Sequence, residues 1–91
     1  MYPEQELKGK VCVVTGAAKS IGLAIAEQYA RAGAATVMFD IDPEVQNVAE
    51  RLNKEGKTAK AYTLDITDRQ AVLASFDEIE SEFGPVYALV N

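Results

Sequence analysis

The feature that most constrains this chain is a regular alternation of short apolar runs and segments with helical periodicity. The apolar runs are Val11–Thr15, Ala35–Asp40, Lys60–Asp65 and Val86–Asn91. Short, continuous apolar runs are typical of strands that are buried on both faces, as in a parallel sheet. Four strands that alternate with three helices therefore predict an α/β fold with right-handed crossovers.

The first two expected helices have recognisable start and stop signals. One spans about Ser20–Ala32, with Ser20 available as its cap. The next begins at Asp42-Pro43, where a capping residue precedes proline at the first helical position, and Gly56 ends it. The apolar faces expected to pack on the sheet are Ile21, Ile25, Tyr29 and Ala32 for the first helix, and Val45, Val48 and Leu52 for the second.

The third expected helix opens at Thr67, whose spacing to Gln70 matches a capping box. Gly84-Pro85 stops it. Its expected apolar face consists of Val72, Phe76, Ile79 and Phe83.

A parallel sheet with this connectivity is doubly wound, and the dinucleotide-binding arrangement places its strands in the order 3-2-1-4. The crossovers then put two helices on one face of the sheet and one helix on the other, and one helix does not cover four strands. The run Val86–Asn91 also reads as a central strand whose outer edge has no partner. We therefore expect residues 1–91 to form one dinucleotide-binding, Rossmann-like unit that is the truncated, N-terminal part of a larger domain.

Composition excludes several classes of function. The 91 residues carry a net charge of -5 without a basic stripe, which argues against a nucleic-acid partner. No apolar run approaches the roughly 18 residues of a membrane span. The chain has no histidine, which removes histidine-based catalysis and histidine metal sites, and we assign no metal. Its single cysteine, Cys12, cannot form an internal disulfide, which fits a cytoplasmic protein.

The sequence VVTGAAKSIGLA, residues 13–24, places small residues where the first strand becomes a helix. A helix that begins at the carboxyl edge of such a sheet directs unpaired N–H groups and a partial positive charge at a ligand. Gly16 allows a tight turn, and Gly22 removes a Cβ where the helix approaches the strand. With the hydroxyl of Ser20 and the backbone of Ile21, the loop predicts a pyrophosphate site. A purely structural turn is the alternative.

Asp40 ends the second apolar run. A carboxylate at that strand tip can accept hydrogen bonds from both hydroxyls of an adenosine ribose, each worth about 1.5–3 kcal/mol. The same charge repels a 2′-phosphate by about 4 kcal/mol at ~4 Å and an effective dielectric constant near 20. Asp40 therefore favours NAD over NADP. Lys19 acts in the opposite direction, because a cation in the loop could pair with a 2′-phosphate, and Asp40 could instead cap a turn together with Asp42.

Taken together, these segments resemble the short-chain dehydrogenase/reductase family over essentially the whole chain. TGAAKSIG is similar to the family's Thr-Gly-x-x-x-Gly-x-Gly loop, with Ser20 in place of the middle glycine. LDITD is similar to the family segment in which an aspartate binds the adenine amino group, which implies that role for Asp65 and places Ile66 against the adenine ring. ALVN is similar to the start of the family's Asn-Asn-Ala-Gly stretch, which implies that Asn91 supports the nicotinamide end.

The resemblance implies an NAD-dependent oxidoreductase that transfers a hydride between the nicotinamide and a secondary alcohol or ketone, of which this chain is the NAD-binding half. The family's proton relay uses a serine and a tyrosine that is followed four residues later by lysine. None of the four tyrosines here has that lysine, so no catalytic residue is assigned within the chain. The complete enzyme would take a small-molecule substrate and form a homo-oligomer, either a dimer or a tetramer.

Two hypotheses from other classes stay open. One is a stand-alone nucleotide-binding or interaction module that performs no chemistry. The other is a different doubly wound protein such as a methyltransferase. Methyltransferases usually carry an acidic residue two positions before the first loop glycine, where this chain has Val14.

Overall fold

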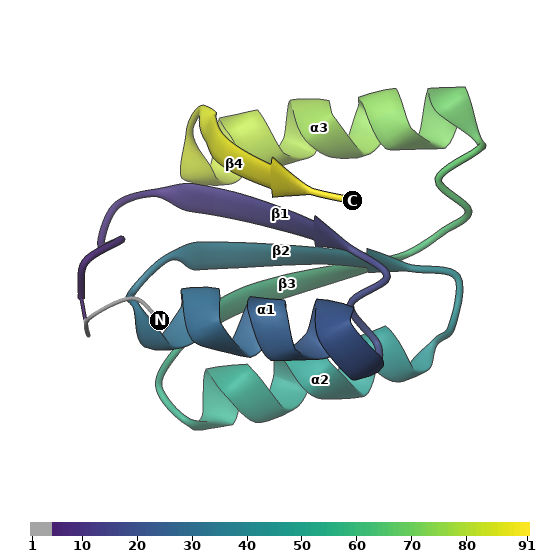
Figure 1. The fold of residues 1–91 in the computed structure, drawn as a ribbon. Helices are drawn as coiled ribbons and strands as arrows, with labels where there is room; N and C mark the ends of the chain where they lie inside the picture. Colours follow the sequence, from purple (N-terminus) through teal and green to yellow (C-terminus); the bar gives the residue numbers. More distant parts are fainter. Residues whose placement is uncertain (1–4) are drawn as a thin grey trace.

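The computed structural model describes residues 5–91, which form a four-stranded parallel sheet flanked by helices (Figure 1). The elements in chain order are β1 (Val11–Thr15), α1 (Ser20–Arg31), β2 (Ala35–Asp40), α2 (Glu44–Lys54), β3 (Thr58–Thr63), α3 (Arg69–Phe83) and β4 (Val86–Val90). The expected alternation of strands and helices is confirmed. Within the described residues, no helix is both long enough and apolar enough to cross a membrane.

The sheet has the strand order β3-β2-β1-β4, as expected for a doubly wound, dinucleotide-binding arrangement. In the centre, Val13 of β1 is paired with Val37 of β2 and with Leu89 of β4. β1 ends at Thr15, opposite Phe39. Asp40 is the next residue of β2, so its side chain lies at the carboxyl edge of the sheet, beside the loop that leaves β1.

The predicted position of β3 was wrong by two residues, because the strand spans Thr58–Thr63 rather than Lys60–Asp65. Two observations explain the shift. The side chain of Asn53 donates to the carbonyl of Ala59 and accepts from its N–H, which fixes the start of the strand beside α2. At the other end, Thr63 is paired with Asp40, the last residue of β2. Asp65 therefore lies beyond the partner strand, in the loop.

The starts of α1 and α2 are capped differently. The expected cap role of Ser20 is wrong, because Lys19 occupies the N-cap and no side chain caps α1. Ser20 is instead the first helical residue, with a left-handed φ of 58°. At α2, Pro43 rather than the expected Asp42 occupies the N-cap, so this cap is also displaced by one residue, although the Asp42 carboxylate accepts the N–H of Glu44 at 2.9 Å.

The expected cap of α3 is also wrong by one residue. Asp68 occupies the N-cap, and its carboxylate accepts the N–H of Ala71 at 3.2 Å. The N–H and the hydroxyl of Thr67 instead donate to Asp65, at 2.9 and 2.7 Å. The carboxylate of Asp65 thus organises the turn that leads into α3.

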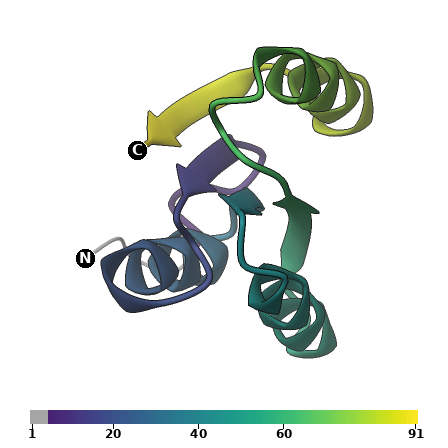
Figure 2. The same ribbon diagram turned by 90° about the vertical axis from the view of Figure 1, so that its right-hand side faces the viewer.

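α1 and α2 cover one face of the sheet, and α3 covers the other (Figure 2). Cys12 is buried on the α1 and α2 face, and burial raises the pKa of its thiol, as suits a core residue. The expected contact face of α1 is corrected at Ile21, which is 77% exposed at the start of the helix. The residues that α1 buries are Ala26, Tyr29 and Ala30.

The face under α3 is covered unevenly. Val13 is fully buried at the centre, whereas its β4 partner Leu89 is 53% exposed on the same face. Leu73 of α3 is also 53% exposed. The expectation that a single helix does not cover four strands is therefore confirmed.

Candidate functional site

The loop between β1 and α1 is held against the end of β2 by three consecutive backbone N–H groups. The N–H groups of Gly16 and Ala17 donate to the carbonyl of Phe39 at 2.8 and 3.3 Å. The N–H of Ala18 donates to Oδ2 of Asp40 at 2.9 Å. Gly16 has a φ of 65°, which is the left-handed conformation that glycine adopts most easily. These three donors are therefore committed to fixing the loop rather than to a ligand.

The next N–H groups along the chain form the start of α1. The N–H groups of Ser20, Ile21 and Gly22 donate to no acceptor within residues 5–91, because α1 has no preceding turn to pair with them. An ideal Cβ at Gly22 would overlap the carbonyl oxygen of Gly16 and lie 2.7 Å from its carbonyl carbon. Only glycine allows the helix to approach the loop this closely. The three N–H groups lie at the positive end of α1, which is a suitable site for an anion.

The carboxylate of Asp40 lies between the loop and the start of α2. Its Oδ2 accepts from Ala18, and its Oδ1 accepts the N–H of Asp42 at 2.9 Å. Asp40 is half-buried. An ionised carboxylate offers about four lone-pair positions, so two remain for hydroxyl donors from a ligand. The sequence left open that Asp40 caps a turn together with Asp42. The structure contains this turn, and the Asp40 carboxylate keeps two acceptor positions in addition to it.

A hollow of about 220 Å³ opens beside Asp40. It brings together four residues that the sequence nominated, and three that it did not. The nominated residues are Gly16, Asp40, Asp65 and Ile66. The additional residues are Phe39, Ile41 and Leu64. Ile41 and Ile66 are 68% and 52% exposed, so two aliphatic side chains border the hollow close to two carboxylates. Apolar walls with a few polar groups suit a flat, partly apolar ring.

Asp65 lies at the rim of this hollow with one carboxylate oxygen already occupied. Its Oδ1 accepts the N–H and the hydroxyl of Thr67. These two hydrogen bonds lower the pKa of Asp65, and the backbone bond has the larger effect. The carboxylate therefore stays ionised at neutral pH, and its Oδ2 accepts from no other described residue.

The remaining nominated residues do not line the hollow. Ser20, Ile21 and Gly22 lie at the start of α1, where Ile21 is exposed. Asn91 follows β4, where its Oδ1 accepts from the hydroxyl of Thr15 at 3.3 Å. Thr15 was not nominated from the sequence, although its place as the last residue of β1 is the signal that could have identified it.

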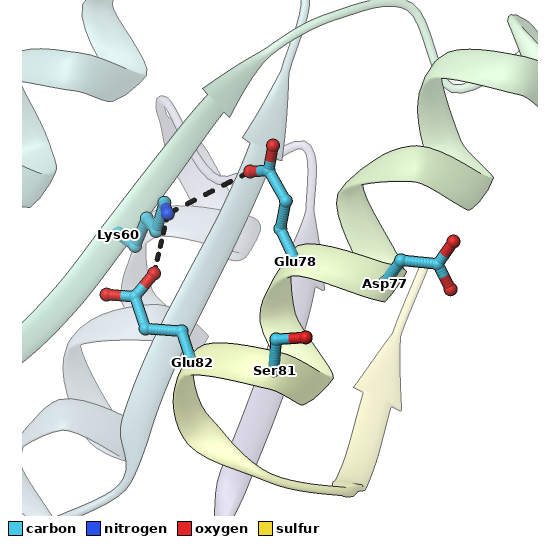
Figure 3. A pocket seen from close by; sticks show the side chains of 5 residues that line it. All are labelled: Lys60, Asp77, Glu78, Ser81 and Glu82. Carbon is cyan, nitrogen blue, oxygen red and sulfur yellow. Dashed lines mark hydrogen bonds and ion pairs between the residues drawn. The ribbon is translucent and has the colours of Figure 1, made fainter.

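A second hollow, of about 460 Å³, lies between β3 and α3, and none of its lining residues belongs to the glycine loop (Figure 3). Lys60 Nζ lies 2.7 Å from Glu82 Oε1 and 4.0 Å from Glu78 Oε1. The hydroxyl of Tyr62 donates to the same Glu78 oxygen at 2.9 Å. Figure 3 shows that Asp77 points away from this group. The two glutamates closest to this hollow are thus paired, and the cluster joins β3 to α3.

Because of this ion-pair cluster, the free energy of unfolding should decrease as the pH becomes alkaline. The hydrogen bond to Glu82 raises the pKa of Lys60 above its ordinary 10.5, so the pair stabilises the fold fully below that pH and is lost as the pH rises through the raised value. Exposed pairs contribute less than about 1 kcal/mol. Urea denaturation at about pH 8 and about pH 11 should therefore show a smaller alkaline loss in Glu82→Gln than in the wild type.

Glu80→Gln is the matched control for this change. It removes the same charge from α3, but Glu80 forms no ion pair within the described residues. The alkaline loss in this variant should equal that of the wild type. Equal reductions in Glu80→Gln and Glu82→Gln would show that the cluster does not cause the effect.

Comparison with known proteins assigns the chain to one family. The family model for short chain dehydrogenase matches residues 10–91. The chain is 40% identical over 86 residues to the short chain dehydrogenase/reductase dpchG of Colletotrichum higginsianum, covering 93% of this chain and 32% of that protein. It is 38% identical over 86 residues to 2,3-dihydro-2,3-dihydroxybenzoate dehydrogenase of Bacillus subtilis, covering 93% and 33%.

Solved structures agree with this assignment. The citronellol catabolism dehydrogenase of Pseudomonas aeruginosa superposes with a TM-score of 0.91 at 25% identity, covering 100% of this chain and 38% of that one. A structure assigned as a D-mannonate oxidoreductase from Haemophilus influenza, with bound NAD, gives a TM-score of 0.85 at 27% identity, covering 92% and 30%. The chain thus spans about a third of the length of the curated relatives it matches. It belongs to the short chain dehydrogenase family.

Proposed function

We propose that this chain is the NAD-binding part of a short-chain dehydrogenase/reductase. The observation that carries the proposal is the position of Asp40, whose carboxylate lies between the start of α1 and the hollow of about 220 Å³. An anion site, a carboxylate with spare acceptor capacity and a partly apolar hollow follow one another along the carboxyl edge of the sheet. This order matches the pyrophosphate, ribose and adenine of a dinucleotide.

The roles proposed for individual residues follow from that order. The pyrophosphate would bind at the start of α1 through the backbone N–H groups of Ser20, Ile21 and Gly22 and through the hydroxyl of Ser20, with Gly16 forming the turn before them. This assignment is supported by three N–H groups that have no acceptor within the described residues, and by the Cβ-free space at Gly22. The committed N–H of Gly16 limits its part to shaping the turn.

The adenosine end would occupy the hollow. Asp40 would accept the ribose hydroxyls, Asp65 the adenine amino group, and Ile66 would pack on the ring, with Ile41 as an additional apolar wall. The pKa of Asp65, held low by Thr67, supports an ionised acceptor. Asn91, anchored to Thr15, would support the nicotinamide end. When bound, NAD would supply a hydride acceptor; the residues of this chain bind and orient it.

The complete enzyme is proposed to pass a hydride between NAD(H) and a secondary alcohol or ketone, because relatives over this region are named as dehydrogenases. The proton relay would come from residues other than those of this chain, since none of its tyrosines has the required lysine. A cytoplasmic location, a small-molecule substrate and a homo-oligomeric state, either dimer or tetramer, are proposed with it.

Replacing Asp40 with alanine tests the ribose assignment. The variant loses acceptors for ribose hydroxyls, so NAD affinity should fall by roughly 10- to 100-fold, which corresponds to the net loss of about one charged hydrogen bond. NADP should lose less, because the repulsion of its 2′-phosphate is removed at the same time. Isothermal titration calorimetry of both cofactors measures the difference. Equal losses of affinity for NAD and NADP would contradict the assignment of Asp40 to the ribose.

A further inference from the structure

The Asp40 carboxylate accepts a hydrogen bond from the N–H of Ala18, and ribose recognition alone does not require this bond. It joins residues 22 positions apart in the sequence and connects the tip of β2 to the centre of the glycine loop. The adjacent carbonyl, that of Phe39, holds Gly16 and Ala17. Two neighbouring residues of β2 therefore accept all three N–H groups that fix the loop, and the side-chain acceptor among them is Asp40.

We propose that the Asp40 carboxylate positions the phosphate-binding loop, as a latch, in addition to its role toward the ribose. This inference rests on the proposed function, because it assigns the support of the pyrophosphate site to a residue outside that site. A latch of this kind would make loop geometry and cofactor choice depend on the same side chain.

The loop needs such an external constraint. Ala18 is 5% exposed, so its N–H has no ready replacement from water if the carboxylate is removed. Two residues further on, Ser20 has a φ of 58°, a conformation that non-glycine residues rarely adopt unless their surroundings impose it. Loss of the latch would therefore let residues 18–20 relax and would move the N–H groups of Ser20, Ile21 and Gly22 away from a common target.

Removing the Asp40 carboxylate should change the affinity for a ligand without a ribose in opposite directions, depending on whether Asp40 positions the loop or only accepts ribose hydroxyls. Inorganic pyrophosphate retains the two linked phosphates of the proposed ligand, with more negative charge, but has no ribose hydroxyls for Asp40 to recognise. If Asp40 only accepted ribose hydroxyls, removing its negative charge would leave pyrophosphate binding unchanged or make it tighter. If Asp40 positions the loop, the same change should weaken pyrophosphate binding.

The experiment uses uniformly ¹⁵N-labelled protein and two variants. Asp40→Ala removes the latch, whereas Asp42→Asn removes a nearby charge but retains an acceptor for the N–H of Glu44. In Asp40→Ala, the amide of Ala18 should exchange with solvent at least ~10-fold faster, and pyrophosphate affinity should fall by ~10-fold. In Asp42→Asn, both quantities should stay within about twofold of the wild type. Circular dichroism verifies that each variant is folded.

Two results would overturn the latch: an Ala18 amide that remains protected in Asp40→Ala, or pyrophosphate that binds this variant as well as or better than the wild type. If Asp40→Ala does not fold, Asp40→Asn replaces it. An amide has one acceptor oxygen, so exchange must then accelerate at Ala18 or at Asp42, and wild-type protection at both would refute the latch. If the wild type binds neither NAD nor pyrophosphate, the proposed function fails, while Ala18 exchange still decides whether the latch exists.

Discussion

Replacing Gly22 with alanine is expected to lower NAD affinity by at least ~100-fold and to destabilise the fold by about 1–3 kcal/mol. The added Cβ would overlap the Gly16 carbonyl group, which is backbone and cannot rotate out of the way. Either α1 must move from the end of β1 or the loop must open. Both responses separate the three N–H groups at the start of α1, so binding suffers more than stability.

Gly56→Ala is the matched control for this substitution. Gly56 has a φ of 84°, but no atom lies within 4 Å of an added Cβ. The left-handed conformation costs a non-glycine residue about 1–2 kcal/mol, so stability should fall by an amount similar to that in Gly22→Ala. NAD affinity, measured by calorimetry, should not change. If Gly22→Ala binds NAD like the wild type, the close approach is irrelevant to the site.

Phe39→Ala should produce the largest loss of stability, about 3–5 kcal/mol. Phe39 is 1% exposed and packs edge-on against Tyr62 at 5.3 Å and Phe76 at 5.7 Å between ring centroids. This three-ring cluster joins β2 and β3 to α3. Domains of this size have a total free energy of unfolding of about 5–15 kcal/mol, so the variant should be close to unfolding at 37 °C.

Urea denaturation followed by circular dichroism measures this effect. Leu73→Ala serves as the control, since Leu73 is also a large apolar residue on the α3 side of the sheet but is 53% exposed. Its loss should stay below about 1 kcal/mol. Similar losses in the two variants would mean that the ring cluster is not the main contact between α3 and the sheet.

The sequence predicted strands more accurately than helix starts. Apolar runs located β1 and β2 because burial on both faces leaves few alternatives for those residues, and an apolar run also located β4, although that strand is exposed at Tyr87 and Leu89. β3 is an edge strand with polar residues, so its limits depend on where β2 ends and on Asn53, neither of which has a signal in the run itself. The caps of α1 and α3 were misjudged because Ser20 and Thr67 take other roles: one adopts a left-handed φ and the other bonds to Asp65.

Part of the candidate site was also accessible from the sequence. Gly16, Asp40, Asp65 and Ile66 were nominated and lie around one hollow. The contribution of Ile41 was missed because a single exposed apolar residue after a strand is common and carries no information by itself. The bond from Ala18 to Asp40 was missed because a backbone N–H donor has no residue-specific signal; only the three-dimensional structure reveals its partner.

The central claim is that the carboxyl edge of the sheet binds NAD, and a ¹⁵N–¹H NMR titration of the wild-type protein with NAD tests it most directly. The account predicts shifts for the amides of Ser20, Ile21 and Gly22 at one end of the site, and for those of Asp65 and Ile66 at the other, with unchanged signals along β3 and α3. No shifts at millimolar NAD, or shifts confined to the hollow around Lys60 and Glu82, would contradict it.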